Sequence, residues 1–241
     1  MAQADATPIQ ESQPGPSVAN LLAEAIGAFT LIFVGASTIA ATFDHSTGGA
    51  NLVAAALAQG LAIGVMVAAT GHISGGVFNP ALTLGLFIGG QLSAAKGAAY
   101  VFAQLVGATL AALAVNAIFP ASLTGAPVNL GIPAVGAPHF TAANAFLAEV
   151  IATFFLMYVV FGVAIDKRGP AVIAGLAIGL TITIDIFAVA GVSGAAMNPA
   201  RWFGPALVEN LWTNAWVWIL GPAVGAVLAA LVHKYVYLRK S

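Results

Sequence analysis

Long apolar stretches alternate with short polar connections along most of this chain. Six of these stretches contain about 20 or more residues, the length that an α-helix needs to cross the hydrocarbon core of a bilayer. We therefore predict six transmembrane helices, at 19–42, 50–70, 98–119, 142–165, 170–190 and 213–237.

Two further apolar stretches, 78–89 and 198–208, are too short to cross a bilayer, and each carries Asn-Pro-Ala at its beginning. Asparagine is a preferred N-cap, and proline loses no hydrogen bond in the first turn of a helix because the N–H there has no intrahelical partner. Each Asn-Pro-Ala therefore predicts a helix start. We expect an all-α membrane protein in which these two segments form re-entrant half-helices enclosed by protein.

Four blocks of the first half recur in the same order in the second half. They start at Leu22, Gly60, Ser74 and Val106, and their counterparts start at Leu147, Gly175, Ser193 and Val224. Because each half holds three spans, an odd number, the second half is inverted relative to the first. We expect a 3+3 inverted repeat, about 19–119 and 142–237, whose half-helices enter from opposite faces and meet near the midplane.

Composition agrees with a membrane setting, since 60% of the 241 residues are hydrophobic and 6% are charged, against about 45–50% and about 25% in soluble domains. The net charge of -1 gives no indication of a nucleic-acid partner. The absence of cysteine excludes disulfides and thiolate metal sites, and we expect no metal or cofactor. The ends of the chain, 1–18 and 238–241, are predicted to be tails, the first of them disordered.

The distribution of lysine and arginine predicts the orientation. Apart from Arg201, the basic residues lie in loops, in a tail or at the end of the last span, all on one side of a six-span protein: Lys96, Lys167, Arg168, Lys234, Arg239 and Lys240. The connections 43–50, 120–141 and 209–213 contain none. The positive-inside rule therefore places both termini in the cytoplasm of a multi-pass protein of the cell membrane.

The two motifs, Asn79-Pro80-Ala81 and Asn198-Pro199-Ala200, are the first candidates for function. Two helix starts that face each other direct two positive dipole ends at the same point, which disfavours cations but not neutral water. The amide N–H groups of Asn79 and Asn198 can donate to a passing water oxygen and interrupt a chain of hydrogen-bonded protons.

Arg201 follows Asn198 by three residues in an otherwise apolar stretch. A charge at membrane depth costs about 2.5–3.5 kcal/mol on insertion scales and faces a watery cavity in most proteins. We interpret Arg201 as a hydrogen-bond donor to solutes and a barrier to cations. A snorkelling arginine at the interface is the alternative.

Four further ionisable residues call for a role. Glu24 and Glu149 occupy matching places in the repeats, and we expect them to accept hydrogen bonds from N–H groups of the re-entrant loops. Asp185 lies within the fifth span, where it either lines the outer vestibule or accepts from loop N–H groups. His72 precedes the first half-helix and is expected to line the inner mouth rather than to sense pH.

With paired Asn-Pro-Ala motifs, six spans, Gly71-His72-Ile73-Ser74-Gly75 before the first motif and Arg201 after the second, the chain resembles the aquaporin (major intrinsic protein) family over about 19–237. The resemblance implies a homotetramer with a separate pore in each subunit.

The resemblance also implies a selectivity filter at four positions counted from the motifs: Gln59, Ile186, Ala195 and Arg201. Strict water channels of the family have an aromatic residue at the first and histidine at the second. Gln59 and Ile186 instead make the chain similar to archaeal and plant-vacuolar members, with a wider and partly apolar constriction.

The function expected is passive passage of water, with ammonia, hydrogen peroxide and urea open as further solutes and with ions and protons excluded. A glycerol facilitator is the alternative, although such proteins have aspartate after the filter arginine and this chain has Trp202. Two remote alternatives are a secondary transporter, disfavoured because few ionisable residues lie near the midplane, and an intramembrane serine protease based on Ser193, for which His233 is the only later histidine.

Overall fold

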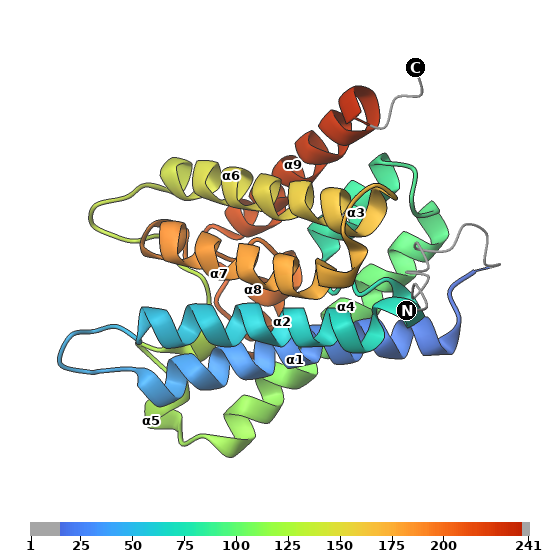
Figure 1. Ribbon diagram of the computed structural model, residues 1–241. Coiled ribbons are helices and arrows are strands. Elements are labelled where there is room, and N and C mark those ends of the chain that lie inside the picture. The colour runs from blue at the N-terminus through green and yellow to red at the C-terminus, as the bar shows by residue number, and fades with distance from the viewer. Residues whose placement is uncertain (1–14, 238–241) are drawn as a thin grey trace.

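In the computed structural model, which describes residues 15–237, the chain folds into a bundle of helices (Figure 1). Six of them, counted with the short turns that extend three, are long and apolar enough to cross a membrane. They are α1 (Val18–Thr42), α2 (Leu52–Ser74), α4 (Ala94–Ile118), α6 (Ala142–Val160), α7 (Ala174–Ser193) and α9 (Ala215–Val232). The predicted tails lie outside the described residues, apart from 15–18, and α1 already begins at Val18.

Two short helices, α3 (Pro80–Ile88) and α8 (Pro199–Glu209), begin at the prolines of the two motifs. They lie between the long helices, where α3 packs against α4 and α9 and α8 packs against α4. The prediction of an all-α fold with six spans and two half-helices is therefore confirmed.

The two halves pack in the same way. Helix α1 lies against α4 in the first half, α6 lies against α9 in the second, and α2 and α7 join the halves. Gly107 allows α4 to approach the carbonyl of Ala25, and Gly225 allows α9 to approach that of Val150, because a side chain at either glycine would collide with the carbonyl oxygen. Small residues at such contacts let membrane helices pack closely.

The helix ends differ from the predicted ones because capping groups, rather than hydropathy, define them. Helix α2 continues beyond residue 70 to Ser74 and ends at Gly75, whose φ of 98° is left-handed. Helix α4 begins at Ala94 rather than 98, since the Ser93 side chain accepts from the backbone N–H of Lys96.

The connections contain short turns that the hydropathy pattern does not indicate. The segment 120–141 includes α5 (Ala121–Thr124) and the 3-10 turn η1 (Asn129–Gly131). A second 3-10 turn, η3 (Ala171–Ile173), leads into α7, and π-helical turns η2 (Phe161–Ile165) and η4 (His233–Tyr237) end α6 and α9. The turn η1 matters below because its last carbonyl reaches the candidate site.

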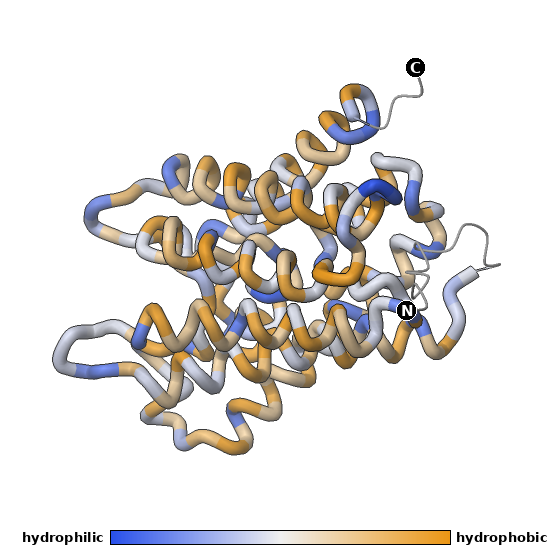
Figure 2. The backbone as a smooth tube through the Cα atoms, viewed as in Figure 1, coloured by the Kyte–Doolittle hydropathy of each residue, from blue (hydrophilic) through white to orange (hydrophobic). Residues whose placement is uncertain are grey.

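Apolar side chains cover the outside of the bundle, and several of the most polar ones lie inside. Figure 2 shows hydrophobic residues along the helices and hydrophilic ones concentrated at the connections. Phe102 and Val65 are 70% and 63% exposed, whereas Glu24 and Glu149 are fully buried. This distribution suits a protein surrounded by lipid.

Candidate functional site

The two Asn-Pro-Ala motifs meet in the middle of the bundle as a pair of helix starts. The Oδ1 atom of Asn79 accepts from the backbone N–H groups of Ala81 (2.9 Å) and Leu82 (3.4 Å), which caps α3. The Oδ1 atom of Asn198 accepts from the N–H of Ala200 at 2.9 Å and caps α8 in the same way. Each asparagine therefore satisfies donors that its own helix leaves free.

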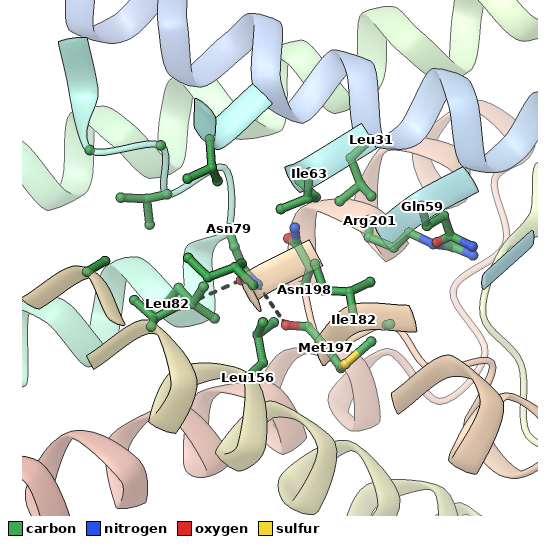
Figure 3. Close-up of a pocket in the computed structure, with 18 of the residues that line it drawn as sticks. Leu31, Gln59, Ile63, Asn79, Leu82, Leu156, Ile182, Met197, Asn198 and Arg201 are labelled. Atoms are coloured by element: carbon green, nitrogen blue, oxygen red, sulfur yellow. Dashed lines mark hydrogen bonds between the residues drawn. The ribbon is translucent and has the colours of Figure 1, made fainter. Parts of the chain in front are cut away.

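The remaining end of each asparagine amide reaches across to the other half. Asn79 Nδ2 donates to the carbonyl of Met197 at 2.8 Å (Figure 3), and Asn198 Nδ2 donates to the carbonyl of Phe78 at 3.0 Å. A primary amide has two N–H donors, so each asparagine keeps one for another partner. These reciprocal bonds hold the two half-helices end to end.

A buried carboxylate holds the loop in front of α3. Glu24 accepts from Val77 N–H (3.1 Å), Phe78 N–H (2.7 Å) and the Ser74 hydroxyl (2.6 Å). Gln104 Nε2 adds a fourth bond at 2.7 Å. The N–H groups of this loop have no backbone partner of their own, and the Glu24 side chain of α1 accepts their hydrogen bonds.

The second half repeats this arrangement in front of α8. Glu149 accepts from Ala196 N–H (2.8 Å), Met197 N–H (2.6 Å) and the Ser193 hydroxyl (2.7 Å). Neither carboxylate forms an ion pair, because the one ion pair among the described residues joins Arg168 and Asp166. Hydrogen-bond donors are therefore the direct partners that compensate for their burial.

A narrow cavity of about 50 Å³ runs past the meeting point of the two half-helices. A water molecule needs roughly 10–15 Å³ of such space, so the cavity accommodates a few waters. Its wall is mostly apolar and includes leucine, isoleucine, valine and alanine side chains from both halves. Among residues 15–237, four polar side chains also line it. Those four are Gln59, Asn79, Asn198 and Arg201.

Arg201 is 5% exposed and lies at one end of the cavity beside Gln59 (Figure 3). Its Nε donates to Gln59 Oε1 at 2.8 Å, and Nη1 donates to the carbonyl of Gly131 at 2.9 Å. Two neutral acceptors therefore hold the guanidinium, and its positive charge is not cancelled by a carboxylate in direct contact.

Three of the four expected filter residues line this cavity, namely Gln59, Ala195 and Arg201. Ile186 is buried, at 3% exposure, but is not part of the wall. Ile182, one helical turn earlier on α7, lines the cavity instead. A filter role for Ile186 remains a prediction.

His72 and Asp185 lie apart from this cavity. His72 is exposed and lines a separate groove between α2 and α7. Asp185 is 4% exposed, and its Oδ2 has no hydrogen-bond partner among residues 15–237. No loop N–H among residues 15–237 donates to this oxygen, and Asp185 does not line the cavity. A place for Asp185 in the outer vestibule remains a prediction.

Other residues that position the site lacked a role in the sequence analysis. Tyr100 donates from its hydroxyl to the Ser74 carbonyl at 2.7 Å, and Trp218 Nε1 donates to the Ser193 carbonyl at 2.9 Å. A signal for this pair exists, since each precedes the last repeated block by the same six residues. Gly131 and Gln104, by contrast, have no counterpart of like chemistry in the repeat.

Comparison with known proteins agrees with the geometry. Residues 11–233 match the family model described as major intrinsic protein. The chain is 40% identical over 222 residues to "Aquaporin NIP1-1" of Zea mays, covering 92% of this chain and 76% of the relative. It is 39% identical over 227 residues to "Probable aquaporin TIP1-2" of Oryza sativa subsp. japonica, covering 90% and 86%.

Among solved structures, the X-ray structure of the aquaglyceroporin from Plasmodium falciparum has the same fold, with a TM-score of 0.82 at 24% identity and coverage of 92% of this chain and 97% of that chain. The fold, the paired motifs and the relatives lead to one conclusion: the chain is a multi-pass membrane protein that belongs to the major intrinsic protein family of channels, the family of the aquaporins.

Proposed function

We propose that this protein is a passive transmembrane channel whose main solute is water, with ammonia, hydrogen peroxide and urea as further neutral solutes. The observation that carries the proposal is the meeting of two capped helix starts at one narrow cavity with a single charged side chain, Arg201, in its wall.

The cavity has a mostly apolar wall with few groups that form hydrogen bonds to a passing solute. Apolar side chains such as Ile63, Leu82 and Ile182 offer a passing water no hydrogen bond. The free N–H of Asn79 and that of Asn198 are donors at the midpoint, where a water oxygen accepts from both and turns its own hydrogens outward. This orientation breaks the hydrogen-bonded chain along which a proton would move.

Exclusion of cations follows from the positive charges that face a narrow, mostly apolar cavity. The positive ends of α3 and α8 converge on the midpoint, and Arg201 adds a full positive charge nearer one end. At an effective dielectric constant of about 20, two like charges 4 Å apart repel by about 4 kcal/mol. A cation meets this barrier after losing hydration water, whereas a neutral solute does not.

The protease hypothesis lacks support from the site. The Ser193 hydroxyl donates to Glu149, while His233 packs against Phe161 with ring centroids 5.1 Å apart, at the end of α9. A glycerol-type facilitator differs from the proposed water channel in solute preference, which permeability to glycerol measures directly.

We further propose a homotetramer with both termini in the cytoplasm of the cell that makes it. In support of the orientation, the basic residues gather where α9 ends: Lys234 Nζ donates to the Ile88 carbonyl at 2.9 Å, and Arg168 donates to the Tyr237 carbonyl at 3.1 Å. Exposed apolar faces on the long helices are available for subunit contacts. Light scattering of the detergent-solubilised protein measures the subunit number.

The experiment for the channel is stopped-flow osmotic shock of proteoliposomes, with water, urea, ammonia and glycerol compared on one preparation. We expect fast shrinkage with a low activation energy and no saturation. Arg201→Val should keep water permeability and loosen ion or proton exclusion. Wild-type permeability equal to that of empty liposomes would overturn the proposal, and saturation would indicate a carrier.

A further inference from the structure

Gln59 of α2 packs closely against α1 beside the cavity. Its side chain is 3% exposed and lies over Gly35 of α1. A Cβ atom at Gly35 would lie 2.9 Å from Gln59 Cγ, closer than such atoms pack. Gly35, which has no side chain, therefore leaves the space that the Gln59 side chain occupies.

Hydrogen bonds determine which way the Gln59 amide faces. Its Nε2 donates to the carbonyl of Ala55, one turn earlier on α2, at 3.2 Å. This leaves Oε1 directed at Arg201, whose Nε–H it accepts at 2.8 Å. The bond links α2 to α8 across 142 residues of sequence.

The guanidinium is thereby fixed at two edges, by Gln59 at Nε and by the Gly131 carbonyl at Nη1. Of the five N–H groups of an arginine side chain, these two bonds use two and leave three for solutes. An arginine side chain loses up to about 2 kcal/mol of rotamer entropy when it is held in one position. Because the acceptors hold the guanidinium already in the folded protein, this entropy is lost on folding and not when a solute binds.

We propose that Gln59 is a positioning residue for Arg201, which fixes the guanidinium in the filter without cancelling its charge. The proposal rests on the proposed channel function and deepens it. A glutamate at this place would hold the arginine equally well but would neutralise it, and an apolar residue would leave it free to move. The neutral amide of Gln59 holds the Arg201 guanidinium in position and also leaves its positive charge, and so the electrostatic barrier, intact.

Three variants separate position from charge. Gln59→Leu removes the acceptor, so we expect the permeability ratio of urea to water to change and ion exclusion to weaken. Gln59→Glu keeps the acceptor and neutralises the pair, so water permeability should persist while K⁺ and H⁺ leak rises. Gly35→Ala displaces Gln59 and should behave like Gln59→Leu, although the glutamine and the arginine are both unchanged.

Matched controls make the same chemical changes away from the cavity. Gln91→Leu and Gln91→Glu alter a glutamine of the connection between α3 and α4 that does not line the cavity. Gly49→Ala adds a methyl group where no atom lies within 4 Å. All three should retain the wild-type urea-to-water ratio and the wild-type leak.

A second readout does not depend on transport. Solid-state NMR of liposome-embedded protein labelled with 15N at arginine Nε reports exchange of the Arg201 N–H with D₂O, the signal being assigned with Arg201→Lys. We expect exchange to be roughly tenfold faster in Gln59→Leu than in wild type and in Gln59→Glu, the ratio for loss of one hydrogen bond to a charged group.

The two proposals fail in different ways. Wild-type liposomes without added water permeability would overturn the channel function, while the exchange measurement would still test the role of Gln59. Unchanged exchange and unchanged permeability ratios in Gln59→Leu, in a protein that conducts water, would overturn the positioning role alone.

Discussion

The first and second repeats build the same loop support from different parts of the chain. Glu24 and Glu149 each accept from two backbone N–H groups and from a serine hydroxyl, at distances between 2.6 and 3.1 Å. Tyr100 and Trp218 each donate to the carbonyl of that serine. Two different ring systems therefore supply the same hydrogen bond, each from a large aromatic side chain.

The repeats differ in what they present to the cavity. Three residues after Asn79 stands Leu82, and three residues after Asn198 stands Arg201, and both line the cavity. The support of the first repeat also has Gln104, where the repeat spacing places Pro222 in the second. Supporting contacts are thus shared, while the charge belongs to one end. On the proposed channel function, we expect substitutions at the shared contacts to affect stability and those at the asymmetric positions to affect selectivity.

The largest effect is expected from removing either carboxylate. Glu24→Ala and Glu149→Ala each leave at least three buried donors unpaired, and each such donor costs about 1–3 kcal/mol. We expect loss of folded protein, measured as yield and thermal unfolding in detergent.

The milder pair Glu24→Gln and Glu149→Gln sharpens the comparison. Glu24 accepts a fourth bond from Gln104, so its variant should be the less stable of the two. Glu209→Gln, at the end of α8, is the control and should change little. A greater loss at Glu149 would contradict the account of the first loop.

The next effect is on selectivity. Arg201→Leu makes the second repeat resemble the first, and we expect cation leak to rise by roughly tenfold or more while water permeability persists. Adding Leu82→Arg to it moves the charge to the matching place in the other repeat. The double variant should regain part of the exclusion, measured by K⁺ and H⁺ flux; a leak equal to that of Arg201→Leu would show that the two places are not equivalent.

Asn79→Ala and Asn198→Ala should reduce stability by nearly the same amount, because their contacts differ only by the long bond of 3.4 Å from the Leu82 N–H to Asn79. Each loses an N-cap, worth about 1 kcal/mol, and one bond to the opposite loop. We expect a decrease in unfolding free energy of about 1–2 kcal/mol for each, measured by denaturant unfolding in mixed micelles. A difference above about 1 kcal/mol would break the symmetry.

The smallest effect is expected for Tyr100→Phe, which removes one hydroxyl and keeps the ring. Interhelical hydrogen bonds made by side chains in membrane proteins average about 0.6 kcal/mol, and this one ends at the Ser74 carbonyl, so the melting temperature should fall slightly. Trp218→Phe loses packing in addition and should cost more, since the indole is 2% exposed. The reverse order would indicate that the hydroxyl, rather than the ring, carries this contact.

Much of the fold was predictable because its causes are local or periodic. Hydropathy over about 20 residues marked the spans, and Asn-Pro-Ala marked both half-helix starts through capping and the fixed φ of proline. The ends of α2 and α4 were less accurate, since Gly75 and Ser93 define them and neither changes the hydropathy of its surroundings.

The candidate site was predictable only in part. The filter positions implied by the resemblance included Gln59, Ala195 and Arg201, which line the cavity, whereas Ile186 does not line it and Ile182 does. Ile182 and Ile186 lie one turn apart on the same face of α7, so they differ in level along the helix axis rather than in direction. The packing of α7 against α2 and α6 determines which level borders the cavity, and the residue count alone does not give that level.

Residue order alone determined the membrane setting, the inverted repeat and the presence of a charge beside the second motif. Hydropathy over about 20 consecutive residues, capping chemistry over the first turn of a helix and the order of the repeated blocks can all be followed along the chain. The bond from Arg201 to Gln59 spans 142 residues, and those between the asparagines and the opposite loops span 118 and 120. Such contacts depend on how close the packed helices bring side chains from distant segments. No local pattern encodes that distance, and it emerges when the two halves assemble.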